Sequence, residues 1–193
     1  MFDGFDHTQY KDEVQVADPN SSGTSYTLLA TVVQLMGEEK GFAYLKALHK
    51  NINQYTKSGA APAKAVSLGE TAIGITFMHD MVAMVLENRD VKVVAPCEGT
   101  GYEIGGMSII KGARNLDNAK KWYDFALTPG PQSLAALNKQ LQISSNKVTP
   151  LAPNSPKLGE IKLIDYDFAK YGSSAERSRL LAKWDTQVKN SPK

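Results

Sequence analysis

The sequence has a single cysteine among 193 residues, so it excludes an internal disulfide and a metal site built from several thiolates. Cys97 is followed by an acid and has no base near it in sequence, so we expect a packed small side chain rather than a nucleophile. No apolar run approaches the roughly 20 residues of a membrane-spanning helix. The first residues are acidic and lack an apolar stretch, so we expect no secretory signal there.

An excess of one charge is also missing. The chain carries 22 Lys and Arg against 20 Asp and Glu, a formal net charge of +2, and both signs are dispersed. This argues against nucleic acid and against a charged membrane surface as partners. The 42% hydrophobic and 22% charged content predicts a globular chain of one large domain or slightly more.

Catalytic motifs are absent as well. The sequence has no Gly-x-Ser-x-Gly elbow, no Walker sequence, no His-Glu-x-x-His and no ordered Ser-His-Asp set. The glycine-rich stretch 98–106 leads from one expected strand to another rather than into a helix, so it is not a dinucleotide fingerprint. We therefore expect no enzyme, no catalytic residue and no cofactor.

What the sequence does contain is an alternation of strand and helix patterns. Short β-branched runs predict strands at 14–17, 52–56, 71–78, 91–95 and 103–110. Apolar residues at helical spacing predict helices over 24–36, from 41, from 61, from 79, from 115, over 132–140 and over 175–188. Strands that alternate with helices indicate an α/β sheet.

The most informative turn joins the first strand to the first long helix. Its residues Ser21, Ser22, Gly23 and Thr24 open the helix, where backbone N–H groups have no intrahelical partner and the helix dipole is positive. Such a start can hold an anion. An ordinary N-cap explains the same residues, and both interpretations stay open.

Two further polar groups follow strands. Thr56, Lys57, Ser58 and Gly59 form a second hydroxyl-rich helix opening, which capping would also explain. His79 and Asp80 follow an apolar strand and can hydrogen-bond a hydroxylated ligand, although an acid in the first helical turn is also favoured by the dipole. We expect the other two histidines, His7 and His49, at the surface.

Four segments together resemble the extracellular solute-binding proteins of ABC importers. The group includes ferric-iron, hexose-phosphate and phosphonate binders, and the segments are residues 18–24, 54–62, 74–80 and 98–105. They occur in the right order, and the helix pair at 115–135 is also similar, so the resemblance covers about residues 12 to 140.

The resemblance implies an incomplete type II periplasmic-binding-protein-like α/β fold, one lobe plus the C-terminal part of the other. Residues 13–103 would form the second lobe, 104–147 a remnant of the first, 148–160 a linker loop, and 161–193 a C-terminal segment whose helix docks on the second lobe. The N-terminal part of the first lobe would be absent, so we expect a truncated chain.

The implied function is capture of a phosphorylated sugar or related organic phosphate in the periplasm, for delivery to an ABC permease. Carried over by motif, the ligand-binding residues would be Ser21, Ser22, Gly23, Thr24, Thr56, Lys57, Ser58, Gly59, His79, Asp80 and Glu103. These agree with the residues chosen from strand ends and helix starts.

Two alternatives remain. Ferric iron is the first, with Tyr55, Tyr102, Asp80 and Glu103 as ligands, but the Tyr-Tyr pair of typical ferric binders is missing. The second is a fragment that binds nothing and self-associates, for example as a homodimer that exchanges residues 104–147. An enzyme is disfavoured because His79, Asp80 and Glu103 have no evident nucleophile beside them.

Overall fold

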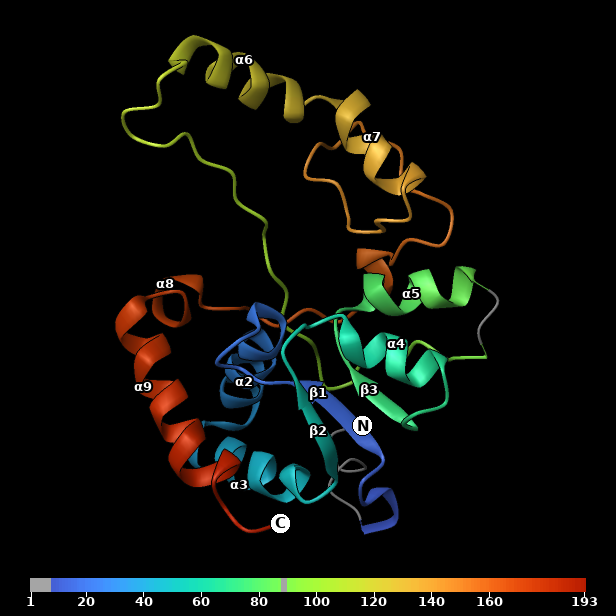
Figure 1. Cartoon of the computed structure of the whole chain (residues 1–193), viewed down its shortest axis with the longest axis vertical. Coiled ribbons are helices and arrows are strands. Elements are labelled where there is room, and N and C mark those ends of the chain that lie inside the picture. The colour runs from blue at the N-terminus through green and yellow to red at the C-terminus, as the bar shows by residue number, and fades with distance from the viewer. Residues whose placement is uncertain (1–7, 88–89) are drawn as a thin grey trace. The chain divides into compact units, whose positions relative to one another are not determined.

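The computed structural model describes residues 8–87 and 90–193, which divide into two compact units (Figure 1). The first unit contains the described residues up to Tyr102 together with Lys157–Lys193, and the second is Glu103–Pro156. Each unit is described by itself below.

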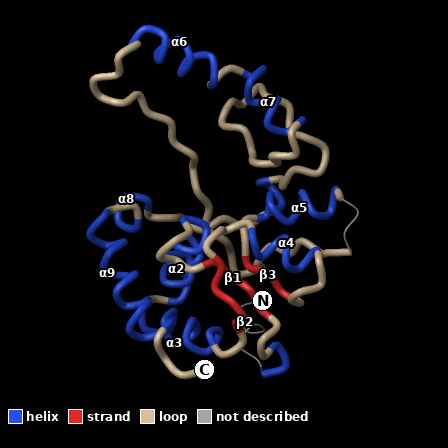
Figure 2. The backbone as a smooth tube through the Cα atoms, in the orientation of Figure 1, coloured by secondary structure: helices blue, strands red, loops and turns tan. Residues whose placement is uncertain are grey.

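A parallel three-stranded sheet forms the centre of the first unit, drawn red in Figure 2. The strand order is β2-β1-β3, with bounds Val14–Ala17 for β1, Ile52–Thr56 for β2 and Ile73–Ile75 for β3. Val16 of β1 is aligned with Tyr55 on one side and Ile75 on the other. Because all three strands run in the same direction, their carboxyl ends lie along one edge of the sheet.

Helices follow each strand, as the alternating pattern predicted. Those of the first unit are α2 (Gly23–Met36), α3 (Glu38–His49), α4 (Ala61–Ser67), α5 (Met78–Leu86), α8 (Phe168–Tyr171) and α9 (Ser174–Trp184). Short 3-10 turns η1 and η2 cover Thr8–Tyr10 and Leu158–Glu160, and a π-helical turn, η3, continues α9 over Asp185–Lys189.

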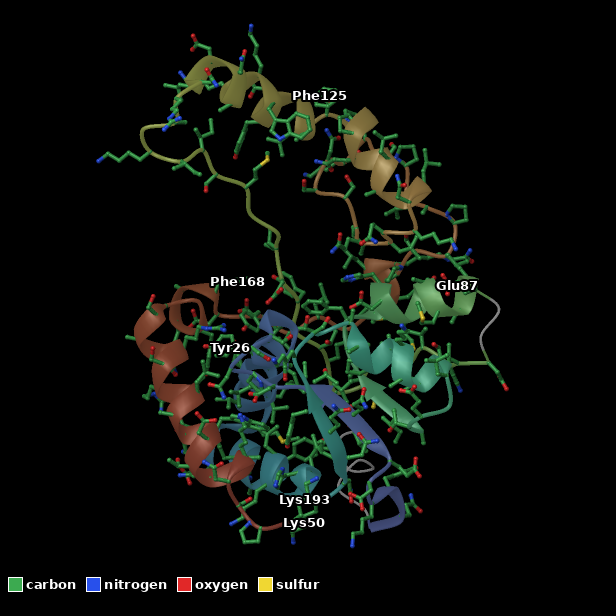
Figure 3. All side chains as sticks on the ribbon, viewed as in Figure 1. Tyr26, Lys50, Glu87, Phe125, Phe168 and Lys193 are labelled. Atoms are coloured by element: carbon green, nitrogen blue, oxygen red, sulfur yellow. The ribbon has the colours of Figure 1, made fainter. Side chains whose placement is uncertain are left out.

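The core of the first unit joins sequence-distant segments. Its most deeply buried side chains, at 0–1% exposure, include Val14, Leu29, Val32, Ile52, Leu180 and Val188. Each such burial stabilises the fold by about 1.5–3 kcal/mol relative to an exposed side chain. Tyr26 of α2, labelled in Figure 3, donates from its hydroxyl to the carbonyl oxygen of Tyr171 at 2.7 Å. The C-terminal helix is therefore part of the same core as the sheet.

The second unit consists of α6 (Leu116–Ala126), α7 (Pro129–Leu137) and irregular segments. Pro129 lies in the first turn of α7, where a missing N–H costs nothing, so the Pro-Gly-Pro stretch begins this helix after the break that follows Ala126. Asn146 donates from its side chain to the carbonyl oxygen of Leu127 at 2.7 Å, which ties the following loop to the helix pair. Neither helix has a buried residue among those described.

Several local predictions were wrong. Residues 91–95 and 103–110 carry strand-like patterns but lie in no strand, since a pattern of β-branched residues makes a strand only where a neighbouring strand supplies hydrogen-bond partners. The third strand is also shorter than predicted, at Ile73–Ile75. His49 is 4% exposed rather than at the surface, and Cys97 is exposed rather than packed. His7 lies outside the described residues.

Candidate functional site

The three polar turns predicted from the sequence lie at the carboxyl edge of the sheet. Residues 18–22 follow β1, residues 57–60 follow β2, and residues 76–77 follow β3. Ligand sites in open α/β sheets usually lie at this edge, because helix starts and strand ends converge there. Hydrogen bonds and close packing join the three turns, and these contacts define the site.

The first turn forms a true helix cap. Ser22 has an extended backbone, and its side-chain oxygen accepts from the N–H of Ser25 at 3.4 Å. The capping interpretation is therefore confirmed. It does not compete with anion binding, because Gly23 and Thr24 lie in the first helical turn, where N–H groups have no intrahelical acceptor. The positive end of the helix dipole adds to the attraction for an anion.

The second turn packs directly against the first. The hydroxyl of Ser21 donates to the carbonyl oxygen of Lys57 at 3.2 Å. A Cβ atom on Gly59 would overlap Thr24 Oγ1 and lie 3.0 Å from Ser22 Oγ, so only glycine fits there without a shift. The hydroxyl groups of Ser21, Ser22 and Thr24 thus lie against the backbone of the second turn.

The third turn brings the predicted His79 and Asp80 to the same edge. Asp80 lies in the first turn of α5, and its Oδ1 is 3.6 Å from Nε2 of His79. Both side chains are about one-fifth exposed, at 21% and 23%, so a ligand can reach them. The imidazole of His79 also stacks on Phe77, with ring centroids 5.5 Å apart, which limits its rotation.

Sequence reasoning missed Thr76, which connects the second and third turns. Its hydroxyl oxygen lies 2.8 Å from the carbonyl oxygen of Gly59 and 3.2 Å from Oδ2 of Asp80. Its place directly after an apolar strand, four residues before an acid, was the available signal. Glu103, the remaining predicted ligand residue, is the first residue of the second unit, so the site described here consists of first-unit residues.

The C-terminal segment makes side-chain contacts with the first turn. Lys189 Nζ lies 2.5 Å from Oδ2 of Asp18, and Asn20 donates from its amide side chain to Asp185 Oδ1 at 2.9 Å. Burial raises the pKa of Asp18, but hydrogen bonds from Lys189 and Asn20 outweigh it and hold this pKa below its usual value. Asp18 therefore stays ionised and keeps its partners near neutral pH.

A cavity of about 480 Å³ lies beside the site in the first unit. Residues of α2, of β3 and of the irregular stretch 92–96 line it, mostly with apolar side chains. Thr24 and Thr76 belong both to this lining and to the polar site. The site therefore has a polar edge at the turns and an apolar wall next to them.

The tyrosines of the iron alternative are engaged elsewhere. The hydroxyl of Tyr55 lies 2.9 Å from Nδ1 of His49, its ring meets Trp184 edge-on, and burial raises its pKa above the usual value. Tyr102 packs against Phe168 with ring centroids 5.2 Å apart. In the described part of the chain, no group of three or more His, Cys, Asp or Glu side chains is arranged to hold a metal ion. The phenol of Tyr55, which is buried and hydrogen-bonded to His49, is a poor ligand for Fe(III).

Comparison with known proteins places this geometry in a family. The chain matches the bacterial extracellular solute-binding protein family over residues 2–171. It is 49% identical over 180 residues to an uncharacterized protein of Haemophilus influenzae, a match that covers 93% of this chain and 52% of that one. It therefore spans about half the length of this relative.

Solved structures of periplasmic binding proteins also match this chain. The periplasmic binding protein AfuA from Actinobacillus pleuropneumoniae, with fructose 6-phosphate bound, is 50% identical with a TM-score of 0.94, over 98% of this chain and 60% of that one. The periplasmic binding protein P5PA is 40% identical with a TM-score of 0.90, over 97% and 60%. A ferric binding protein from Campylobacter jejuni shares the fold, with a TM-score of 0.75 and 19% identity.

The predicted type II periplasmic-binding-protein fold, present here in part, is confirmed by these matches. Within the residues that the structure describes, no helix is both long and apolar enough to cross a membrane. The family match extends over most of the sequence and includes all three turns of the site. The chain therefore belongs to the bacterial extracellular solute-binding proteins.

Proposed function

We propose that the chain forms the ligand-holding lobe of an ABC importer's solute-binding protein whose cargo is a phosphorylated sugar or related organic phosphate. The observation that carries the proposal is the convergence of three polar turns at one sheet edge, around the start of α2. The bound fructose 6-phosphate of AfuA, at 50% identity, supports the same class of cargo.

Each turn would contribute a different interaction. The phosphate would accept from the N–H groups of Gly23 and Thr24 and from the hydroxyl groups of Ser22 and Thr24, with Lys57 adding positive charge. Asp80 and His79 would accept from and donate to sugar hydroxyls. This division matches the chemistry of a sugar phosphate, which is anionic at one end and hydroxylated along the rest.

The proposal describes binding without turnover. Capture would take place in the periplasm, and an ABC permease would receive the ligand. Ferric iron is not favoured as cargo, because the phenol of Tyr55 is hydrogen-bonded to His49 and packed on Trp184.

Isothermal calorimetry of the chain with fructose 6-phosphate, inorganic phosphate and ferric citrate tests the proposal. We expect heat of binding with the sugar phosphate, lost in Ser22→Ala and in Asp80→Asn. Absence of binding to the sugar phosphate, or saturable binding of iron alone, would contradict it.

The chain offers matched controls for both variants. Ser173 caps α9 by accepting from the N–H of Glu176, as Ser22 caps α2, so Ser173→Ala removes the same kind of cap away from the site. Either cap loss destabilises the protein by about 1 kcal/mol, but only Ser22→Ala should weaken binding. Asp117 lies in the first turn of α6, so Asp117→Asn is the corresponding control for Asp80→Asn.

A further inference from the structure

Thr76 has a position in the site that ligand binding alone does not explain. It is the first residue after β3, and its hydroxyl oxygen lies between two acceptors, Gly59 O at 2.8 Å and Asp80 Oδ2 at 3.2 Å. A hydroxyl has a single hydrogen, and a carbonyl and a carboxylate can only accept. The one donor is therefore shared between the turn after β2 and the start of α5.

The Gly59 end of this bridge is held rigidly. Gly59 packs so closely on Ser22 and Thr24 that a side chain at this position would overlap Thr24. Its backbone position is thus tied to the start of α2, where the phosphate would bind. The hydrogen bond from Thr76 to the Gly59 carbonyl therefore also fixes the distance between Thr76 and the start of α2.

The Asp80 end is the part that would meet sugar hydroxyls. One carboxylate oxygen lies 3.2 Å from the Thr76 hydroxyl, and the other is 3.6 Å from Nε2 of His79. The hydrogen bond from Thr76 therefore orients the carboxylate. The orientation of the Asp80 carboxylate relative to the start of α2 depends on Thr76.

We propose that Thr76 is a positioning residue that sets the spacing between the anion-binding turns and Asp80. This spacing selects ligands that carry a phosphate and hydroxyl groups on one rigid frame, the phosphorylated sugars, over inorganic phosphate. The proposal rests on the proposed function for its ligand, but the bridge itself is a property of the unliganded chain.

Four proteins test it by calorimetry with fructose 6-phosphate and with inorganic phosphate: the unmodified chain, Thr76→Val, Thr76→Ser and Thr71→Val. Thr71 is the matched control, because its hydroxyl donates to the carbonyl oxygen of Glu13 at 2.8 Å, before β3 and away from the site. We expect Thr76→Val to bind the sugar phosphate about fivefold more weakly, the effect of one lost hydrogen bond, with phosphate affinity unchanged. Thr76→Ser should restore the preference, and Thr71→Val should leave it intact.

Equal weakening of both ligands in Thr76→Val, no weakening, or no rescue by Thr76→Ser would overturn the proposal. Absence of sugar phosphate binding in the unmodified chain would instead count against the proposed function. Amide hydrogen exchange then tests whether Thr76 links the turn after β2 to the start of α5 in solution. Faster exchange at both 58–60 and 79–81 in Thr76→Val, but not in Thr71→Val, supports it, and unchanged exchange at either segment refutes it.

Discussion

The ammonium group of Lys189 lies 2.5 Å from a carboxylate oxygen of Asp18, across 171 positions of sequence. Asp18 directly follows β1 and also accepts from the backbone N–H of Asn20 at 2.9 Å. One carboxylate thus shapes the turn that leads to α2 and attaches the C-terminal segment to it. The integrity of the site therefore depends on a residue near the end of the chain.

Replacing Lys189 by methionine tests this dependence. Loss of the ion pair should raise the pKa of Asp18, which Lys189 and Asn20 hold below its usual value. Carbon-13 NMR of the carboxyl group measures the change. Lys157→Met, which removes an exposed ion pair with Glu160, is the control and should leave Asp18 unaffected. An unchanged Asp18 pKa in Lys189→Met would show that the contact is not maintained in solution.

Glu38 should contribute to the acid sensitivity of the fold. Hydrogen bonds from Arg179 and then Lys183 lower the pKa of Glu38 to about 2, from an ordinary value of 4.5. A carboxyl whose folded pKa is depressed stabilises the protein above its unfolded pKa and loses that effect as pH falls through the folded value. We expect this contribution to disappear between about pH 4.5 and pH 2, as followed by thermal unfolding. Its size is under about 1 kcal/mol, because the pair is at the surface.

Glu38→Gln should flatten the pH dependence of stability in that window. The neighbouring Glu39, whose side chain is 93% exposed, provides the control, since Glu39→Gln should leave the profile close to that of the unmodified chain. Identical profiles for all three proteins would mean that the Arg179 cluster contributes nothing to acid stability.

Gly59→Ala should disturb the site by steric overlap. The added methyl group would meet Thr24 Oγ1 and Ser22 Oγ, so the two turns must separate, at a cost of about 1–3 kcal/mol. We expect fructose 6-phosphate affinity to fall at least about tenfold, which is the equivalent of 1.4 kcal/mol. Gly105→Ala is the control, because nothing lies within 4 Å of a Cβ there. Equal affinities of the two variants would argue against contact between these turns.

The second unit should promote self-association. Large apolar side chains on it are exposed, among them Ile110 at 80%, Leu137 at 78%, Ile104 at 71%, Trp122 at 63% and Phe125 at 52%, the last labelled on α6 in Figure 3. Surfaces of this kind are usually covered by a partner. Light scattering over a concentration series should show dimers, and Trp122→Lys with Leu137→Lys should shift the population toward monomer. A monomer at all concentrations would contradict this expectation, including the predicted exchange of residues 104–147.

Sequence patterns predicted the first half of the fold because local signals and tertiary partners agree there. The run Val14–Ala17 and the apolar spacing of α2 are satisfied by burial on both sides, and parallel strands then bring the turns together. Residues 91–95 have an equally good strand pattern but no neighbouring strand, and a sequence pattern cannot reveal that.

The contacts that complete the site were not predictable for a different reason. Thr76 acts through the carbonyl of Gly59, and Lys189 through Asp18, so each depends on three-dimensional packing rather than on spacing along the chain. His49 was expected at the surface, but it is 4% exposed. Its hydrogen bonds to Tyr55 and to the carbonyl oxygen of Ser191 explain why it tolerates burial.

The most direct test of the account is a fructose 6-phosphate titration followed by amide proton and nitrogen chemical shifts. Binding at the carboxyl edge predicts saturable shifts at Gly23, Thr24, Gly59 and Asp80, with little change at the opposite ends of β1 and β3. The absence of saturable shifts, or shifts confined to residues far from the three turns, would contradict the assignment of this edge as the sugar phosphate site.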